Sequence, residues 1–334
     1  MPSPLLASDA DTQATDERAD RAAFNTYVEQ LIRMERARGT KKPWSFSGSA
    51  SYGHDDNVAL NSSRVGDWFH QENTRLVLAV PHQGLWNVFG PGEIGIEGNA
   101  EYRDYDLRQS FDHYRAGARP FVTTQLAGGL ADFSYDAKWL GYVHNRNLDY
   151  LRHRLTSGLK WKISSALSHR PYFSYSLKRY LDRRASQDSG VFDDSRREDI
   201  AYEAGHQLFF TLSKSMRAVL TLSWEKNDGN DLFLKFNDYD RYSADGAVEW
   251  RLAEKILTVL KGGYDFTDYE ERLIAAGSAE TETNDYFYLS ANLFYSLTQN
   301  LRFGVTYLYG QNYSNKPSQE YSFSNSTAGL YFNF

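Results

Sequence analysis

The sequence predicts an all-β fold, a closed antiparallel up-and-down transmembrane β-barrel of about 14 strands, preceded by a short N-terminal helix. Three observations predict this fold. Apolar and polar side chains alternate with period two from Trp44 onward. Tight polar turns alternate with longer charged loops, and the sequence ends on an alternating segment that finishes at Phe334. The expected division is residues 1–42, an N-terminal periplasmic segment, and residues 43–334, the barrel.

Residues 1–42 differ in pattern from the rest. They are polar and acidic through Asp20, and then apolar residues follow at helical spacing, from Phe24 through Ile32. We expect one amphipathic helix from about Glu17 to Arg38, because the residue before Pro43 resists helical geometry. No secretory signal peptide is visible, so we expect the sequence to start near the mature N-terminus. The favoured interpretation is a periplasmic lead-in that could dock a periplasmic protein, and the alternative is a plug in or under the barrel mouth.

The clearest strands place apolar side chains on one face and polar side chains on the other. In one, Tyr202 and Leu208 are expected to face outward, whereas Glu203 and Gln207 face inward. The same alternation continues through segments near residues 218–225, 241–252 and 287–297. Lipid on one side and an aqueous lumen on the other would require this pattern.

The connections alternate in length. Short polar turns are expected at residues 167–170, 212–215, 252–255 and 297–300, and longer loops at residues 185–196, 226–237, 267–284 and 311–320. Residues 80–92 form an unusually long link on the turn side. Short periplasmic turns and long outer loops are typical of outer-membrane barrels.

Composition agrees with this fold. The chain has 24 Tyr, 20 Phe and 7 Trp, enough to supply two interfacial aromatic girdles. No stretch approaches the roughly 18 apolar residues of a spanning helix. The net charge of −6 argues against nucleic acid as a partner, and the absence of cysteine excludes disulfides and thiolate metal sites.

The final strand is expected to carry the signal for membrane insertion. Leu330, Phe332 and Phe334 share the lipid-facing side, and the expected partners are outer-membrane lipid and the barrel assembly machinery.

The inward positions predict two charged walls in the lumen. The fourth to seventh strands contribute a basic wall, relieved by Asp132 and Asp136, whose members are Arg115, Arg119, Lys138, Arg152, Arg154, Lys160, Lys162 and Lys178. The eighth to eleventh strands contribute a wall of mixed charge that leans acidic through Glu203, Glu225, Asp245, Glu249 and Asp265. Opposed walls would set a transverse field across an open or gated pore. The alternative is a filled barrel in which these charges pair with one another.

Catalytic and metal-binding patterns are weak. No GxSxG, P-loop, GxGxxG or HxxxH pattern occurs, and the loose acidic stretches at residues 55–57 and 227–231 do not complete an EF-hand. We therefore expect no cofactor, no metal and no enzymatic activity. A catalytic group assembled in space would escape this reasoning.

Two short segments resemble known barrels. Residues 49–58, SASYGHDDNV, resemble the start of outer-membrane β-barrels that follow helical tetratricopeptide regions in Gram-negative bacteria, and residues 237–242, NDYDRY, resemble a recurring segment there. The resemblance points to polysaccharide export barrels or surface lipoprotein assembly modifiers. The function expected first is a channel that passes polar solutes or a polysaccharide. The alternatives are a secretion or assembly barrel for a protein partner such as a surface lipoprotein, and an outer-membrane hydrolase.

Overall fold

A computed structural model describes residues 43–58, 60, 65–84, 90–144, 146, 149–186, 192–230, 237–275 and 277–334. The predicted periplasmic segment and its amphipathic helix, in residues 1–42, lie outside these residues. Among the helices of the described ranges, none is long and apolar enough to cross a membrane.

The described residues form 14 strands and two single turns of 3-10 helix, η1 (Gln109–Phe111) and η3 (Pro317–Gln319). The strands are β1 (Trp44–Asp55), β2 (Asp67–His82), β3 (Gly92–Tyr105), β4 (His113–Leu126), β5 (Gly129–Tyr142), β6 (Tyr150–Lys162), β7 (Leu167–Ser186), β8 (Phe192–Thr211), β9 (Met216–Gly229), β10 (Tyr239–Ala253), β11 (Ile256–Leu273), β12 (Thr281–Ser296), β13 (Leu301–Ser314) and β14 (Tyr321–Asn333).

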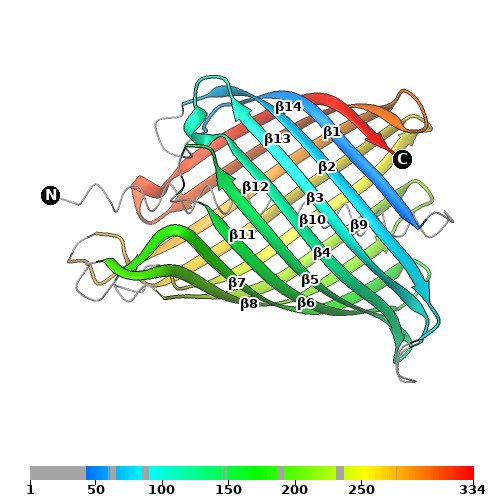
Figure 1. Ribbon diagram of the computed structural model, residues 1–334, viewed down its shortest axis with the longest axis horizontal. Coiled ribbons are helices and arrows are strands. Elements are labelled where there is room, and N and C mark those ends of the chain that lie inside the picture. The colour runs from blue at the N-terminus through cyan, green and yellow to red at the C-terminus, as the bar shows by residue number, and fades with distance from the viewer. Residues whose placement is uncertain are drawn as a thin grey trace.

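These strands close into one barrel, which confirms the predicted fold class and strand number (Figure 1). Each strand pairs antiparallel with its sequence neighbours, and β1 pairs with β14 in the register Ala50 opposite Leu330. Two backbone bonds between Phe46 and Phe334, of 3.1 and 2.8 Å, continue this seam to the turn-side rim. Closure leaves no free strand edge, as hydrocarbon requires of a spanning sheet.

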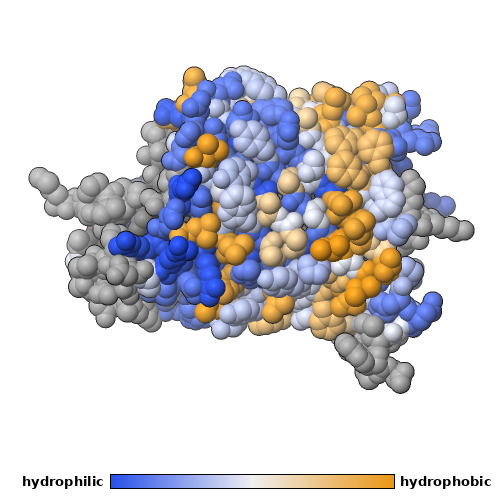
Figure 2. Space-filling view, viewed as in Figure 1, coloured by the Kyte–Doolittle hydropathy of each residue, from blue (hydrophilic) through white to orange (hydrophobic). Residues whose placement is uncertain are grey.

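Alternation along the strands separates a lipid face from a lumen face. On β12, Leu289 and Leu293 are 60% and 50% exposed on the outer surface, whereas Tyr288 and Asn292 are buried on the inner side. Figure 2 shows hydrophobic residues gathered in a band near the end of the barrel that carries the C-terminus, with hydrophilic residues toward the opposite end. This band marks the part of the barrel that the hydrocarbon core of a membrane would surround, and the strands extend beyond it.

The outer hairpins are longer than the sequence predicted. β7 and β8 have 20 residues each and extend into the expected loop 185–196 (Figure 1). β11 continues to Leu273 and β12 starts at Thr281, inside the expected loop 267–284. The charged and small polar residues of these segments predict loops. The strands nevertheless remain paired there, because their outward polar side chains stand in water while inward ones are buried, as in the ion pair of Arg272 with Glu282 at 2.9 Å.

On the turn side, three of the four predicted turns are confirmed and one is wrong. β8 and β12 end just before residues 212–215 and 297–300, as expected, and the predicted turn at 252–255 narrows to residues 254–255 between β10 and β11. Residues 167–170 are not a turn, because β7 begins at Leu167 and the turn occupies residues 163–166. There the backbone N–H of Ile163 donates to the carbonyl of Leu167 at 2.9 Å. The polar run before Pro171 resembled a turn, but it places Arg170 inside the lumen.

One of the two-residue hairpins joins β4 and β5 through Ala127 and Gly128. Both have positive φ, 50° and 75°, which is the geometry of a type I′ turn. The mirror-image turn matches the twist of the flanking strands, so it fixes the register in which Gly117 of β4 lies opposite Lys138 of β5.

Candidate functional site: the charged lumen

The strand register places all eight predicted basic residues at inward positions on β4–β7. Together with Arg170, the inward positions from β4 to Tyr180 of β7 hold nine basic and two acidic side chains. Lys162 is exposed at the turn-side rim, and Lys160 packs its ammonium 3.9 Å from the centre of the Phe209 ring. The others lie deeper, close to other charged or aromatic side chains.

Two arginines at the start of this wall are paired with β3. Glu97 is 4% exposed and accepts two bonds from Arg75 of β2, at 2.8 and 2.9 Å, and one from Arg119 of β4 at 2.8 Å. Because Glu97 lies between two guanidinium groups, these three side chains together carry a net positive charge. Further toward the outer end of β3, Glu101 accepts a bond from Arg115 at 3.2 Å.

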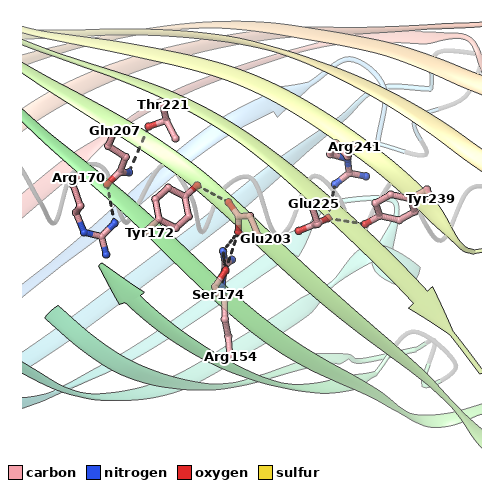
Figure 3. A network of polar contacts seen from close by, with 10 residues as sticks. All are labelled: Arg154, Arg170, Tyr172, Ser174, Glu203, Gln207, Thr221, Glu225, Tyr239 and Arg241. Atoms are coloured by element: carbon pink, nitrogen blue, oxygen red, sulfur yellow. Dashed lines mark hydrogen bonds and ion pairs between the residues drawn. The ribbon is translucent and has the colours of Figure 1, made fainter. Parts of the chain in front are cut away.

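Arg170 of β7 is fully buried in the lumen, at 1% exposure, and sequence reasoning missed it. Its guanidinium bonds Asp132 of β5 at 2.8 and 2.5 Å and donates to Gln207 of β8 at 3.0 Å. Figure 3 shows the continuation from Gln207 to Thr221 of β9. β6 lies between Arg170 and Asp132, and the crossing is possible because β6 carries Gly158 there. A Cβ at Gly158 would lie 2.5 Å from the guanidinium.

A second network joins the basic wall to the mixed wall at Glu203 of β8 (Figure 3). Glu203 is paired closely with Arg154 and accepts bonds from the Tyr172 hydroxyl at 2.6 Å and the Ser174 hydroxyl at 3.1 Å. Directly across the β8–β9 ladder stands a second carboxylate, Glu225. Two carboxylates therefore meet at the boundary between the walls.

On the side away from Glu203, Glu225 contacts two residues of β10. It accepts a bond from the Tyr239 hydroxyl at 2.9 Å and lies 3.6 Å from the guanidinium of Arg241. The resulting order around the lumen is arginine, glutamate, glutamate, arginine, over β6 to β10. Opposite charges outside each carboxylate offset the repulsion between the two.

The remaining predicted acidic residues lie on β10 and β11. Asp245 accepts a bond from the Tyr288 hydroxyl of β12 at 2.8 Å, across Gly263 of β11, which has no side chain to block it. Glu249 and Asp265 are buried among inward basic residues of the same region, which include Arg217 and Lys261. The structure thus places all five acidic residues on the lumen side, interleaved with cations.

The third side of the lumen carries charge only near its two ends, which sequence reasoning did not single out. On the fully described strands β13, β14 and β1, the charged inward residues are Arg302 near the turn side and Asp55 near the outer end, and the inward positions between these two levels carry serine, threonine, asparagine, glycine and leucine. The lumen is therefore basic over β4–β7, mixed over β8–β12 and neutral between the ends of β13–β1. An alternating pattern read strand by strand could have revealed this third side.

Inward-facing aromatic rings collect toward the outer end of the strands. They are Phe69, Tyr105, Tyr142, Tyr150, Tyr180, Tyr239, Tyr269, Tyr286 and Phe323, all buried. Cations stack on several of them. Arg103 lies 4.6 Å from the Phe69 ring centre, Arg197 lies 4.7 Å from Tyr180, and Arg272 lies 4.6 Å from Tyr269. Such contacts hold long basic side chains in fixed positions.

Several histidines of the described ranges bond to other side chains or to the backbone. His153 pairs with the Tyr135 hydroxyl on the lipid face, His169 with His206 at 3.0 Å, and the His113 ring with the Phe111 carbonyl at 2.9 Å. Within the described residues, no group of three or more His, Cys, Asp or Glu side chains could hold a metal ion.

The predicted insertion residues lie on the lipid face of β14. Leu330 and Phe334 are about half exposed, and the Phe332 ring lies 5.7 Å from that of Phe46 across the seam. Phe332 also covers Gly48, where a Cβ would lie 2.5 Å from its ring.

No family model and no characterised protein sequence matches the chain. Among solved structures, the TodX monoaromatic hydrocarbon channel is similar with a TM-score of 0.50 and 8% identity, covering 88% of this chain and 91% of that one. A bacterial polysaccharide outer membrane secretin has a TM-score of 0.48 and 10% identity, covering 88% and 99%. OmpT, an outer membrane protein of Vibrio cholerae, has a TM-score of 0.45 and 11% identity, with the same coverage.

At these identities the likeness concerns the fold. The TodX comparison shows that the two chains share a closed barrel. Together with edge closure and the apolar outer band, it confirms the predicted location. The chain is a β-barrel of the bacterial outer membrane.

Proposed function

We propose that the chain is a non-enzymatic outer-membrane channel that passes polar solutes or a polysaccharide and favours anions. The observation that carries this proposal is the separation of charge around the lumen, with nine basic and two acidic side chains on the inward positions from β4 to Tyr180 of β7. Fixed cations along one wall attract anions and repel cations.

The size of the barrel supports passage rather than a purely structural interior. Eight strands already make a barrel whose interior side chains can fill, and this one has 14. The neutral side over β13–β1 adds hydroxyl and amide groups, which can bond a polar solute without holding it by charge. Docking of a periplasmic protein through residues 1–42, and recognition by the barrel assembly machinery, remain predictions.

Planar bilayers test the proposal. Purified protein is added to a bilayer between solutions of unequal KCl concentration, and the reversal potential is measured. We expect conductance with a reversal potential shifted toward that of chloride. Charge reversal at an exposed rim position, Lys162→Glu, should move the potential toward potassium. If neither the full chain nor a chain lacking residues 1–42 conducts ions or passes sugars, the proposal is wrong.

A further inference from the structure

Three basic side chains stand side by side in one row of the basic wall. Lys138 of β5 lies opposite Arg152 of β6, and Arg152 lies opposite Lys178 of β7. The row is bounded by Gly117 of β4, next to Lys138, and by Asp199 of β8, next to Lys178. Three cations therefore occupy adjacent ladder positions with one carboxylate at the end of the row.

Such a row is costly by itself. Like charges directly opposite each other destabilise a sheet, and here Lys138 and Arg152 are only 5% and 9% exposed. Asp199 also serves another cation, because Arg197 bonds both of its oxygens at 2.9 Å. The row therefore concentrates three positive charges on one level of the basic wall.

The surroundings hold the row in place. The Lys178 ammonium lies 4.3 Å from the centre of the Tyr150 ring and 4.7 Å from that of Tyr180. Tyr150 and Tyr180 belong to a buried cluster directly on the outer side of the row. Gly117 has no side chain of its own, and Asn99 Oδ1 would lie 2.5 Å from a Cβ there. The two ring contacts orient the Lys178 ammonium before any ligand arrives, which lowers the entropy that binding would cost.

We propose that Lys138, Arg152 and Lys178 form a binding subsite for the oxyanion of a solute, a carboxylate or a phosphate. The guanidinium can grip such a group with two parallel bonds. Adjacent strands lie about 4.8 Å apart, so the flanking ammonium groups can reach the same oxyanion or a neighbouring polar group. This inference rests on the proposed channel function, since the subsite would bind a solute on its way through the lumen.

Calorimetric titration of the full-length protein in detergent micelles tests the subsite without any need for conduction. The probes are D-glucuronate and D-glucose 6-phosphate, with D-glucose as the neutral control. We expect saturable binding of at least one anionic sugar and none of glucose. Arg152→Gln should weaken binding about tenfold or more, since it removes a charge-assisted hydrogen-bond donor.

The matched control is Arg179→Gln. Arg179 is the residue after Lys178 on β7, and its side chain, 54% exposed, pairs with Glu198 at 2.8 Å on the outer surface. This variant loses the same charge next to the row but outside the lumen, so its dissociation constant should match that of the wild type. Electrophoresis checks that each variant is folded, because a folded barrel migrates faster in an unheated sample than in a heated one. If Arg152→Gln does not fold, Lys138→Gln takes its place.

The outcomes separate cleanly. Binding of glucuronate alone assigns the subsite to carboxylates, and binding of the phosphorylated sugar alone assigns it to phosphates. No saturable binding of either sugar, or equal dissociation constants for wild type and both lumen variants, would overturn the subsite. Binding without conductance would sustain the subsite and refute the channel, whereas conductance without binding would do the reverse.

Discussion

Gly158 is a position where one added methyl group should break a buried ion pair of the lumen. A Cβ there would lie 2.5 Å from three atoms of the Arg170 guanidinium, which crosses β6 at this point to reach Asp132. Gly158→Ala therefore forces Arg170 aside and breaks its two bonds to Asp132. Breaking a buried ion pair costs about 3–5 kcal/mol, and the partial exposure of Asp132 (27%) lowers the expected loss to about 2–4 kcal/mol.

Urea-induced unfolding in lipid vesicles measures this loss, and a double-mutant cycle identifies its origin. Arg170→Met removes the same bonds, so the double variant Gly158→Ala with Arg170→Met should lose little more than either single variant. Gly98→Ala on β3 is the matched control, because a Cβ there meets nothing within 4 Å. A loss below about 0.5 kcal/mol for Gly158→Ala, or additive losses in the cycle, would refute the crossing of β6 as the cause.

Three further outcomes follow from single groups. Glu97→Ala leaves two guanidinium groups facing each other and should destabilise the barrel by about 3–5 kcal/mol in the same urea assay, more than Glu97→Gln. Tyr172→Phe removes one bond to Glu203 and should cost about 1–3 kcal/mol, with a smaller loss showing that water replaces the hydroxyl. Burial raises the pKa of Asp149 in the outer loop, so the folded state favours its neutral form. As the pH rises from about 4, the ordinary Asp value, the wild type should lose stability relative to Asp149→Asn, and a pH-independent difference between their unfolding midpoints would contradict this.

The sequence was sufficient for the fold because lipid imposes a simple rule on every strand. Tyr202 and Leu220 alternate with buried Gln207 and Thr221 as a period of two requires, and each strand carries enough such positions to be recognised alone. Strand ends were harder to predict. Outside the membrane the outward side chains meet water and are polar like the inward ones, so the apolar–polar alternation fades while the pairing continues, and β7 and β8 extend past their expected ends.

The lumen contacts were out of reach for a different reason. The parity of Arg154 and Glu203 could be read from sequence, but their meeting depends on the register of β6, β7 and β8 together. Arg170 was lost because its polar neighbours before Pro171 resembled a turn. No local pattern indicates that Gly158 lets Arg170 reach Asp132, since a glycine in a strand has many possible causes.

The residues that give the lumen its field also help to fix the register of the barrel. Arg170 over Gly158 and Asp245 over Gly263 each reach a strand two positions away, so each contact constrains three strands at once. A slip of one residue in β7 would turn Arg170 toward lipid, at a cost of about 2–4 kcal/mol near the bilayer midplane, and would also break its pair with Asp132. The charges of the proposed anion pathway would thus also exclude misaligned strands, because a barrel without them would lose the contacts that a slip of one residue breaks.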